Sequence, residues 1–72
     1  MKPVRTVEEA KKLIESFSGR AEEFELPIAD ELQDSVGIHM AIITDYILGK
    51  GWEPNGFNQK AGFRVYRYKV LE

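Results

Sequence analysis

The sequence predicts a small α+β domain in which helices pack on a two- to three-stranded antiparallel sheet that ends in a C-terminal β-hairpin. Three stretches support this fold class. Apolar residues recur at helical spacing in the segment Thr6–Phe17 and again between Leu32 and Trp52. The segment Phe63–Val70 is dominated by β-branched and aromatic residues, as strands are. Because the chain has 72 residues, we expect residues 1–72 to form one domain with a small core.

The first helix is predicted over Thr6–Phe17. Thr6 and Glu9 have the spacing of a capping box, in which a hydroxyl and a carboxylate each satisfy a backbone N–H at the helix start. Ser18-Gly19 ends this helix, because glycine readily adopts the left-handed conformation that follows many helices. The next stretch, Arg20–Leu26, alternates in polarity and predicts a short half-buried strand with an acidic face. That face would pair well beside a strand that carries Arg64, Arg67 or Lys69.

The middle of the chain predicts helix, with one ambiguity. Pro27 suits the first turn of a helix, where its missing N–H is not needed, so Pro27–Gln33 is predicted to be helical. At Asp34–Gly37 two alternatives stay open, because Asp and Ser can cap a new helix whereas a single Gly can also lie inside a continuous one. The helix that follows is predicted to end at Gly49 or Gly51.

The C-terminal third predicts turns and a hairpin. Glu53–Gly56 has the residues of a tight turn, with Pro at the second position and Gly at the fourth. Asn58–Gly62 has the length of a hairpin loop, and Phe63–Val70 is the clearest strand. One face of that strand carries alternate residues from Phe63 to Lys69, and the other carries those from Arg64 to Val70. Both faces are mixed, so the sequence leaves open which one is buried.

The predicted order of elements, α-β-α-α-β-β, resembles that of a winged helix-turn-helix domain. Leu32 before Gly37, the apolar Ile43 and Ile47, and a Lys50-Gly51-Trp52 exit into a hairpin carry the resemblance. It implies that the helix from Ile38 to Leu48 is the recognition helix and that the hairpin around Asn58–Gly62 is the wing. A recognition helix needs donors for base edges and phosphates, but this one carries Asp45 and no Lys or Arg before Lys50.

Composition excludes several classes of protein. There is no cysteine, which excludes a disulfide framework and thiolate metal sites and makes a reducing cytoplasm the expected location. The longest apolar run, Met40–Ile43, is far shorter than the ~20 residues that cross a bilayer, so no membrane contact is expected. We expect no metal, no cofactor and no catalytic residues, because no catalytic constellation is present. Leu71-Glu72 resembles the remnant of an expression tag and carries no functional argument.

The favoured hypothesis is a non-catalytic protein-interaction module whose partner is another protein or a second copy of the chain. The helix that begins at Ile38 has apolar residues on more than one side, so its own neighbours are not expected to cover all of them. Aromatic residues after this helix could add to the contact, since aromatics are common among binding hot spots. The predicted contact residues are Ile38, Ile42, Trp52 and Phe57.

The alternative hypothesis is nucleic-acid binding by the C-terminal hairpin. Its last strand interleaves cations, which could neutralise phosphates, with tyrosines, which could stack on bases. The predicted contacts are Lys60, Arg64, Tyr66, Arg67, Tyr68 and Lys69. The competing interpretation is that the tyrosines pack under the helices while the cations are solvated or pair with Glu22, Glu23 or Glu25. The net charge of −2 favours that interpretation.

Overall fold

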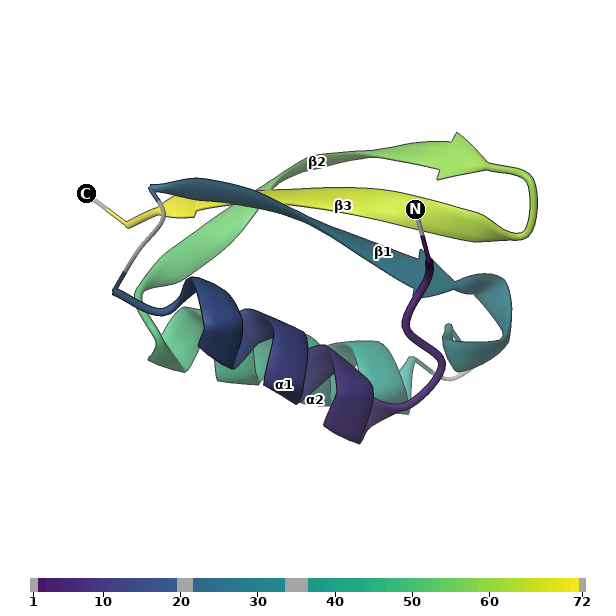
Figure 1. Ribbon diagram of the computed structural model, residues 1–72, viewed down its shortest axis with the longest axis horizontal. Helices are drawn as coiled ribbons and strands as arrows, with labels where there is room; N and C mark the ends of the chain where they lie inside the picture. The colour runs from purple at the N-terminus through teal and green to yellow at the C-terminus, as the bar shows by residue number, and fades with distance from the viewer. Residues whose placement is uncertain (1, 20–21, 34–36, 72) are drawn as a thin grey trace.

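The computed structural model describes residues 2–19, 22–33 and 37–71. The elements follow in the order α1 (Val7–Phe17), β1 (Glu23–Ala29), the 3-10 turn η1 (Asp30–Leu32), α2 (Ile38–Gly49), β2 (Trp52–Lys60) and β3 (Phe63–Val70). Within the described ranges these are two α-helices and a three-stranded antiparallel sheet, which confirms the predicted α+β class and the C-terminal hairpin. Both helices lie on the same side of the sheet (Figure 1). We call the face toward the helices the inner face and the opposite one the outer face.

Helix α1 begins where the capping box predicts. The Thr6 hydroxyl accepts a hydrogen bond from the Glu9 backbone N–H at 3.1 Å. Ala10 and Ile14 are fully buried beneath the sheet. At the other end the Ser18 N–H donates to the Glu15 carbonyl, and Gly19 has a φ of +75°, the left-handed conformation that glycine tolerates best. The prediction for this helix is confirmed.

Strand β1 replaces the helix that was predicted over Pro27–Gln33, so that prediction is wrong. Strand pairing continues through Pro27 to Ala29, and only Asp30–Leu32 coils into a single 3-10 turn. The Pro27 carbonyl accepts from Val4 on the edge of β1 that faces away from β3. On that outer edge a missing N–H breaks no ladder hydrogen bond, so proline is tolerated in the strand. The strand also begins later than predicted, at Glu23, and Arg20 and Ala21 lie outside the described residues.

Helix α2 is separate from the 3-10 turn. Gly37 precedes it with a φ of +72°, which a helix interior does not allow, so the alternative of one continuous helix is excluded. The cap predicted at Asp34-Ser35 lies outside the described residues. The helix ends at Gly49, one of the two predicted ends, and Lys50 donates its backbone N–H to the carbonyls of the last turn. Because the middle helix is missing, the α-β-α-α-β-β order is not reproduced.

Strand β2 contains the residues that were predicted to form a tight turn, and that prediction is also wrong. Glu53–Gly56 lies within the strand, where the register with β3 shifts between Pro54 and Phe57. Such a β-bulge on an edge strand accommodates both a proline and a glycine at positive φ. The strand then continues to Lys60, so the hairpin connection is only Ala61-Gly62 and not the predicted Asn58–Gly62.

Strand β3 lies in the middle of the sheet, which has the order β1-β3-β2. Tyr68 is only 2% exposed, and its ring stacks on Phe24 with centroids 5.2 Å apart. Phe24 in turn stacks on Phe17 of α1 at 4.7 Å. The tyrosines of β3 therefore belong to the inner face, which answers the question left open by the sequence. The core between sheet and helices contains Val4, Ala10, Ile14, Phe24, Leu26, Ile28, Leu32, Ile43, Ile47, Trp52 and Tyr68.

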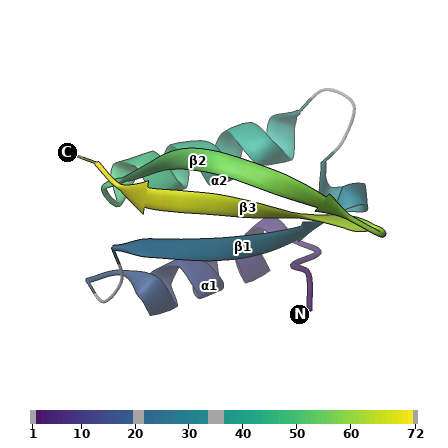
Figure 2. The ribbon, with the colours of Figure 1, turned by 90° about the horizontal axis from the view of Figure 1, so that it is seen from above.

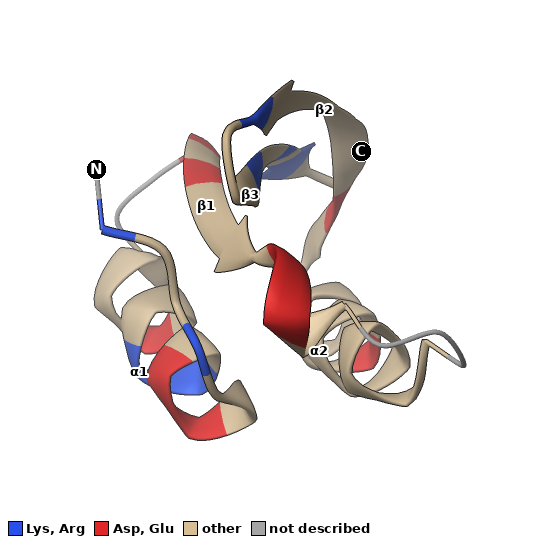
Figure 3. Cartoon of the chain, turned by 90° about the vertical axis from the view of Figure 1, so that its right-hand side faces the viewer, with Lys and Arg blue, Asp and Glu red and all other residues tan. Residues whose placement is uncertain are grey.

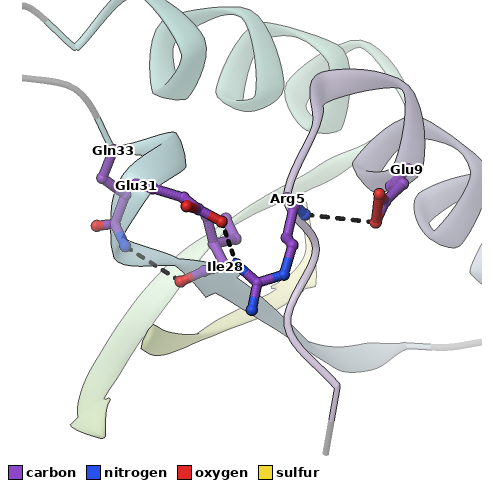
Figure 4. Close-up of polar contacts among 5 residues, drawn as sticks. All are labelled: Arg5, Glu9, Ile28, Glu31 and Gln33. Carbon is purple, nitrogen blue, oxygen red and sulfur yellow. Dashed lines mark hydrogen bonds and ion pairs between the residues drawn. The ribbon is translucent and has the colours of Figure 1, made fainter. Parts of the chain in front are cut away.

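The residues before α1 cross the end of β1. Val4 is 6% exposed and forms a parallel bridge with Ile28, in which its N–H donates to Pro27 and its carbonyl accepts from Ala29. Arg5 then forms an ion pair with Glu31 of η1 (Figure 4). The N-terminal segment thus occupies one half of the outer edge of β1.

Candidate protein-interaction surface

Helix α2 presents apolar side chains to solvent along one side. Ile38 is 58% exposed, and Ile42 and Leu48 are each 41% exposed. Ala41, Asp45 and Gly49 are exposed between them. We call these six residues the α2 outer face, which is a side of the helix and is separate from the outer face of the sheet. Asp45 is its one charged residue, and the ribbon of α2 in Figure 3 is accordingly almost free of charge.

Geometry explains why this side stays uncovered. Ile43 and Ile47 are fully buried and anchor α2 to the sheet, with Trp52 beneath its C-terminal end. Seen from above, α2 lies at one side of the molecule, beside β2 (Figure 2). A helix buries only part of its circumference against one sheet and one neighbouring helix. Since α2 is apolar around most of its circumference, the remaining part contacts water.

A polar cluster holds α2 against α1. The Tyr46 hydroxyl donates to the Glu15 carboxylate, and Lys50 Nζ lies 2.5 Å from the same carboxylate. The ammonium groups of Lys11 and Lys50 lie 5.3 and 5.4 Å from the centroid of the Tyr46 ring, a cation–π arrangement. The hydrogen bond from Lys50, followed by that from Tyr46, lowers the pKa of Glu15. The hydrogen bond to Glu15 raises the pKa of Lys50 and of Tyr46. This cluster fixes the orientation of the α2 outer face.

The four predicted protein-contact residues do not form one surface. Ile38 and Ile42 lie together on α2, as expected. Trp52 is 3% exposed and packs edge-on against Phe24 at 4.7 Å, so it belongs to the core and not to the surface. Trp52 is buried because it is the first residue of β2, directly after the turn that follows α2, and its side chain lies on the inner face of the sheet. Phe57 is 49% exposed, but it lies on β2.

Phe57 is held in place by its neighbours. Its ring lies 5.3 Å from the ring of Tyr66, and the guanidinium of Arg64 lies 4.9 Å from its centroid. Arg64 Nε donates to the Gln59 side chain at 2.7 Å, and its Nη1 donates to the Tyr66 hydroxyl at 3.2 Å. That hydroxyl donates to Gln33 beyond η1 at 2.8 Å. The group braces the hairpin against the segment that follows β1.

The six predicted nucleic-acid contacts are divided between the two faces of the sheet. Tyr68 is buried and cannot stack on a base. Arg64 and Tyr66 hydrogen-bond to each other on the inner face, within the group around Phe57. Among the described residues of the outer face, three cations stand against three carboxylates: Lys60, Arg67 and Lys69 against Glu23, Glu25 and Glu53. Lys69 Nζ lies 3.7 Å from Glu53. A face with balanced charge gives no net attraction for phosphates. Among the described residues only Lys69 of these cations has an ion pair, and its partner is Glu53, not Glu22, Glu23 or Glu25.

Two features of the site were not predicted. Leu48 is exposed beside Ile38 and Ile42 but is not among the four predicted contact residues, and the cluster of Glu15, Tyr46 and Lys50 was not predicted. The i,i+4 spacing of Tyr46 and Lys50 is visible in the sequence. Their convergence on Glu15 depends on how α1 and α2 cross, which no local pattern contains.

The described residues contain no group of three or more His, Cys, Asp or Glu side chains arranged to hold a metal ion. No described helix is long and apolar enough to cross a membrane. A scan against protein-family models matches no family, and searches of curated proteins and of solved structures find no match. The winged-helix resemblance therefore stays a prediction.

Proposed function

We propose that this chain is a non-catalytic protein-interaction module that associates with a second copy of itself through the α2 outer face. The observation that carries the proposal is the exposure of Ile38, Ile42 and Leu48 on one side of one helix. Burying apolar area is worth roughly 25 cal/mol per Å², so leaving three large aliphatic side chains in water forgoes stabilisation that a partner can supply. The lack of cysteine fits a cytoplasmic setting for this module.

A second copy is a partner that the low charge of the α2 outer face allows. In a twofold contact one patch pairs with itself, so it must be self-complementary. The α2 outer face meets this requirement through its apolar and small residues, and Asp45 is the one charge that the two copies must keep apart. The net charge of −2 gives two copies little long-range repulsion.

The contact should be weak. A helix of 12 residues is about 18 Å long. One face of such a helix is smaller than the ~800 Å² per partner that stable complexes typically bury. We therefore expect association that depends on concentration, with the monomer dominant in dilute solution.

Sedimentation velocity over a wide concentration range tests the proposal. The wild-type chain should shift from monomer to dimer as concentration rises, whereas Ile42→Glu should stay monomeric because it places a carboxylate in the centre of the contact. Val70→Glu is the matched control, since Val70 is 42% exposed against 41% for Ile42 but lies on β3. Dimerisation should survive in this control. A wild-type chain that stays monomeric at every concentration, or an Ile42→Glu variant that dimerises like wild type, contradicts the proposal.

A further inference from the structure

The two outer edges of the sheet differ in how they are protected. The edge of β2 contains Pro54 and a bulge and ends at Lys60, three features that discourage a further strand from pairing. The edge of β1 is occupied near its C-terminal end, where Val4 pairs with Ile28. The first half of that edge, Glu23–Leu26, has no strand beside it among the described residues.

The hydrogen bonds of Val4 show which backbone groups of β1 point outward. The Val4 N–H donates to the Pro27 carbonyl at 2.9 Å, and the Ala29 N–H donates to the Val4 carbonyl at 3.0 Å. On the other side, the Val70 N–H donates to the Glu22 carbonyl at 2.8 Å, so even-numbered residues bond toward β3. Because these directions alternate along an antiparallel strand, the N–H and C=O groups of Glu23 and Glu25 face the open edge.

The side chains on this edge give it a negative charge. Glu23 and Glu25 are both exposed, and the register places them opposite Lys69 and Arg67 of β3. Lys69 instead forms its ion pair with Glu53 on β2. Within the described residues neither Glu23 nor Glu25 has an ion pair within 4 Å, so both carboxylates can accept a cation from outside.

Arg67 also extends away from β1. Its Nη2 lies 2.9 Å from the position that a β-carbon on Gly56 would occupy. With the Asn58 amide oriented so that its oxygen faces the guanidinium, Arg67 Nη1 donates to it at 3.1 Å. Both cations of β3 therefore interact with β2, which leaves the β1 edge acidic.

We infer that the open half of the β1 edge binds an extended, basic polypeptide segment by strand addition. The backbone of the segment pairs with the outward N–H and C=O groups of Glu23 and Glu25. Its alternate Lys or Arg side chains lie beside these two carboxylates on the outer face, where opposite charges on neighbouring strands stabilise the pairing. This mode of recognition takes affinity from the backbone and specificity from alternate side chains.

The same charges argue against a second copy at this edge. Antiparallel pairing of β1 with β1 of another molecule would bring Glu23 and Glu25 near the same residues of the partner, and like charges across a strand pair are destabilising. This site is also distinct from the α2 outer face, because α2 lies beside β2 whereas β1 forms the other edge of the sheet (Figure 2).

Amide exchange and a peptide titration test the inference. The probe is a capped peptide of alternating Lys and Val, and the control peptide has Glu in place of each Lys. The basic peptide should slow hydrogen exchange at the Glu23 and Glu25 amides, which should exchange faster than Phe24 and Leu26 in the free chain. The acidic peptide should have no such effect. Protection at the Phe57–Lys60 edge, or equal effects of both peptides, would overturn the inference.

Two variants separate strand addition from general electrostatic attraction. Glu25→Pro removes one outward N–H together with the carboxylate, and Pro27 shows that β1 accepts proline at this alternation. It should weaken binding at least tenfold more than Glu25→Gln, which removes the same carboxylate but keeps the N–H. Equal losses in both variants would indicate charge attraction alone and contradict strand addition. If Glu25→Pro does not fold, Glu25→Lys serves instead and should favour the acidic peptide. Unchanged peptide binding by Ile42→Glu would show that this site is independent of self-association.

Discussion

The guanidinium of Arg67 lies against the backbone of Gly56, with Nη2 2.9 Å from where a β-carbon would stand. Gly56 has a φ of +93°. The bulge in β2 therefore serves two purposes, since it absorbs Pro54 and provides room for an arginine that crosses from β3.

Gly56→Ala should lower the free energy of unfolding by more than the backbone strain alone. The left-handed conformation costs an ordinary residue about 1 to 2 kcal/mol, and the new methyl group must also displace Arg67. Gly62→Ala is the control, because Gly62 has a φ of +83° and no atom within 4 Å of the added carbon. Urea unfolding of both variants measures the difference. In an Arg67→Ala background the two substitutions should become equally destabilising, and a persistent difference there would show that the arginine is not its cause.

Glu15 should make stability depend on pH in the acidic range. Its hydrogen bonds from Lys50 and Tyr46 lower its pKa in the folded state below the unfolded value. This contribution is therefore fully present above the unfolded pKa, about 4.3, and is lost as pH falls through the folded pKa. Thermal unfolding should show Glu15→Gln less stable than wild type at neutral pH, with the gap closing as pH falls through the folded pKa of Glu15. A gap that stays constant across this range would contradict the prediction.

Tyr68 should make stability depend on pH in the alkaline range. Burial raises its pKa, because the phenolate would lose its hydration in the core. Above the unfolded pKa of about 10 the unfolded chain loses this proton first, so stability falls as pH rises. Tyr68→Phe should reduce this alkaline loss, as measured by urea unfolding at neutral and alkaline pH. The same alkaline loss in wild type and variant would assign it to other groups.

Pro54 should protect the edge of β2 from pairing with other chains. Pro54→Val restores a backbone N–H and raises strand propensity at the bulge. Light scattering of concentrated samples over time should show faster aggregation for this variant than for wild type. Asn55→Val raises strand propensity next to the same bulge but keeps the proline. If it aggregates as fast, hydrophobicity and not the missing N–H is responsible.

The sequence predicts those elements whose signals are local. Thr6 and Glu9 lie one turn apart, and their capping box marks the start of α1 correctly. The alternating aromatic and β-branched residues of Phe63–Val70 likewise predict β3 with its correct bounds. In both cases the residues that carry the signal contact one another or share one strand, so no knowledge of the rest of the fold is needed.

The errors arise where a residue fits two local structures and the tertiary fold selects one. Pro27 is compatible with a first helical turn and with an edge strand, and pairing with β3 selects the strand. Pro54 and Gly56 fit a tight turn equally well, but pairing of β2 on both sides of them produces a bulge. Each of these choices depends on contacts between residues that are far apart in the sequence.

The candidate surface was predicted in part for the same reason. Ile38 and Ile42 are exposed as expected, because α2 has more apolar positions than one sheet and one helix can cover. The sequence alone does not show that Trp52 differs from these two isoleucines in solvent exposure. Its burial follows from the direction in which the chain leaves α2, which no spacing of apolar residues specifies.

The strand at the centre of the sheet is also the last of the three strands in chain order. Strands β1 and β2 do not pair with each other, and each pairs with β3. A nascent chain that has emerged only as far as Lys60 can coil its helices but has no template on which its first two strands can align. The sheet therefore cannot assemble on the ribosome until Phe63–Val70 has emerged.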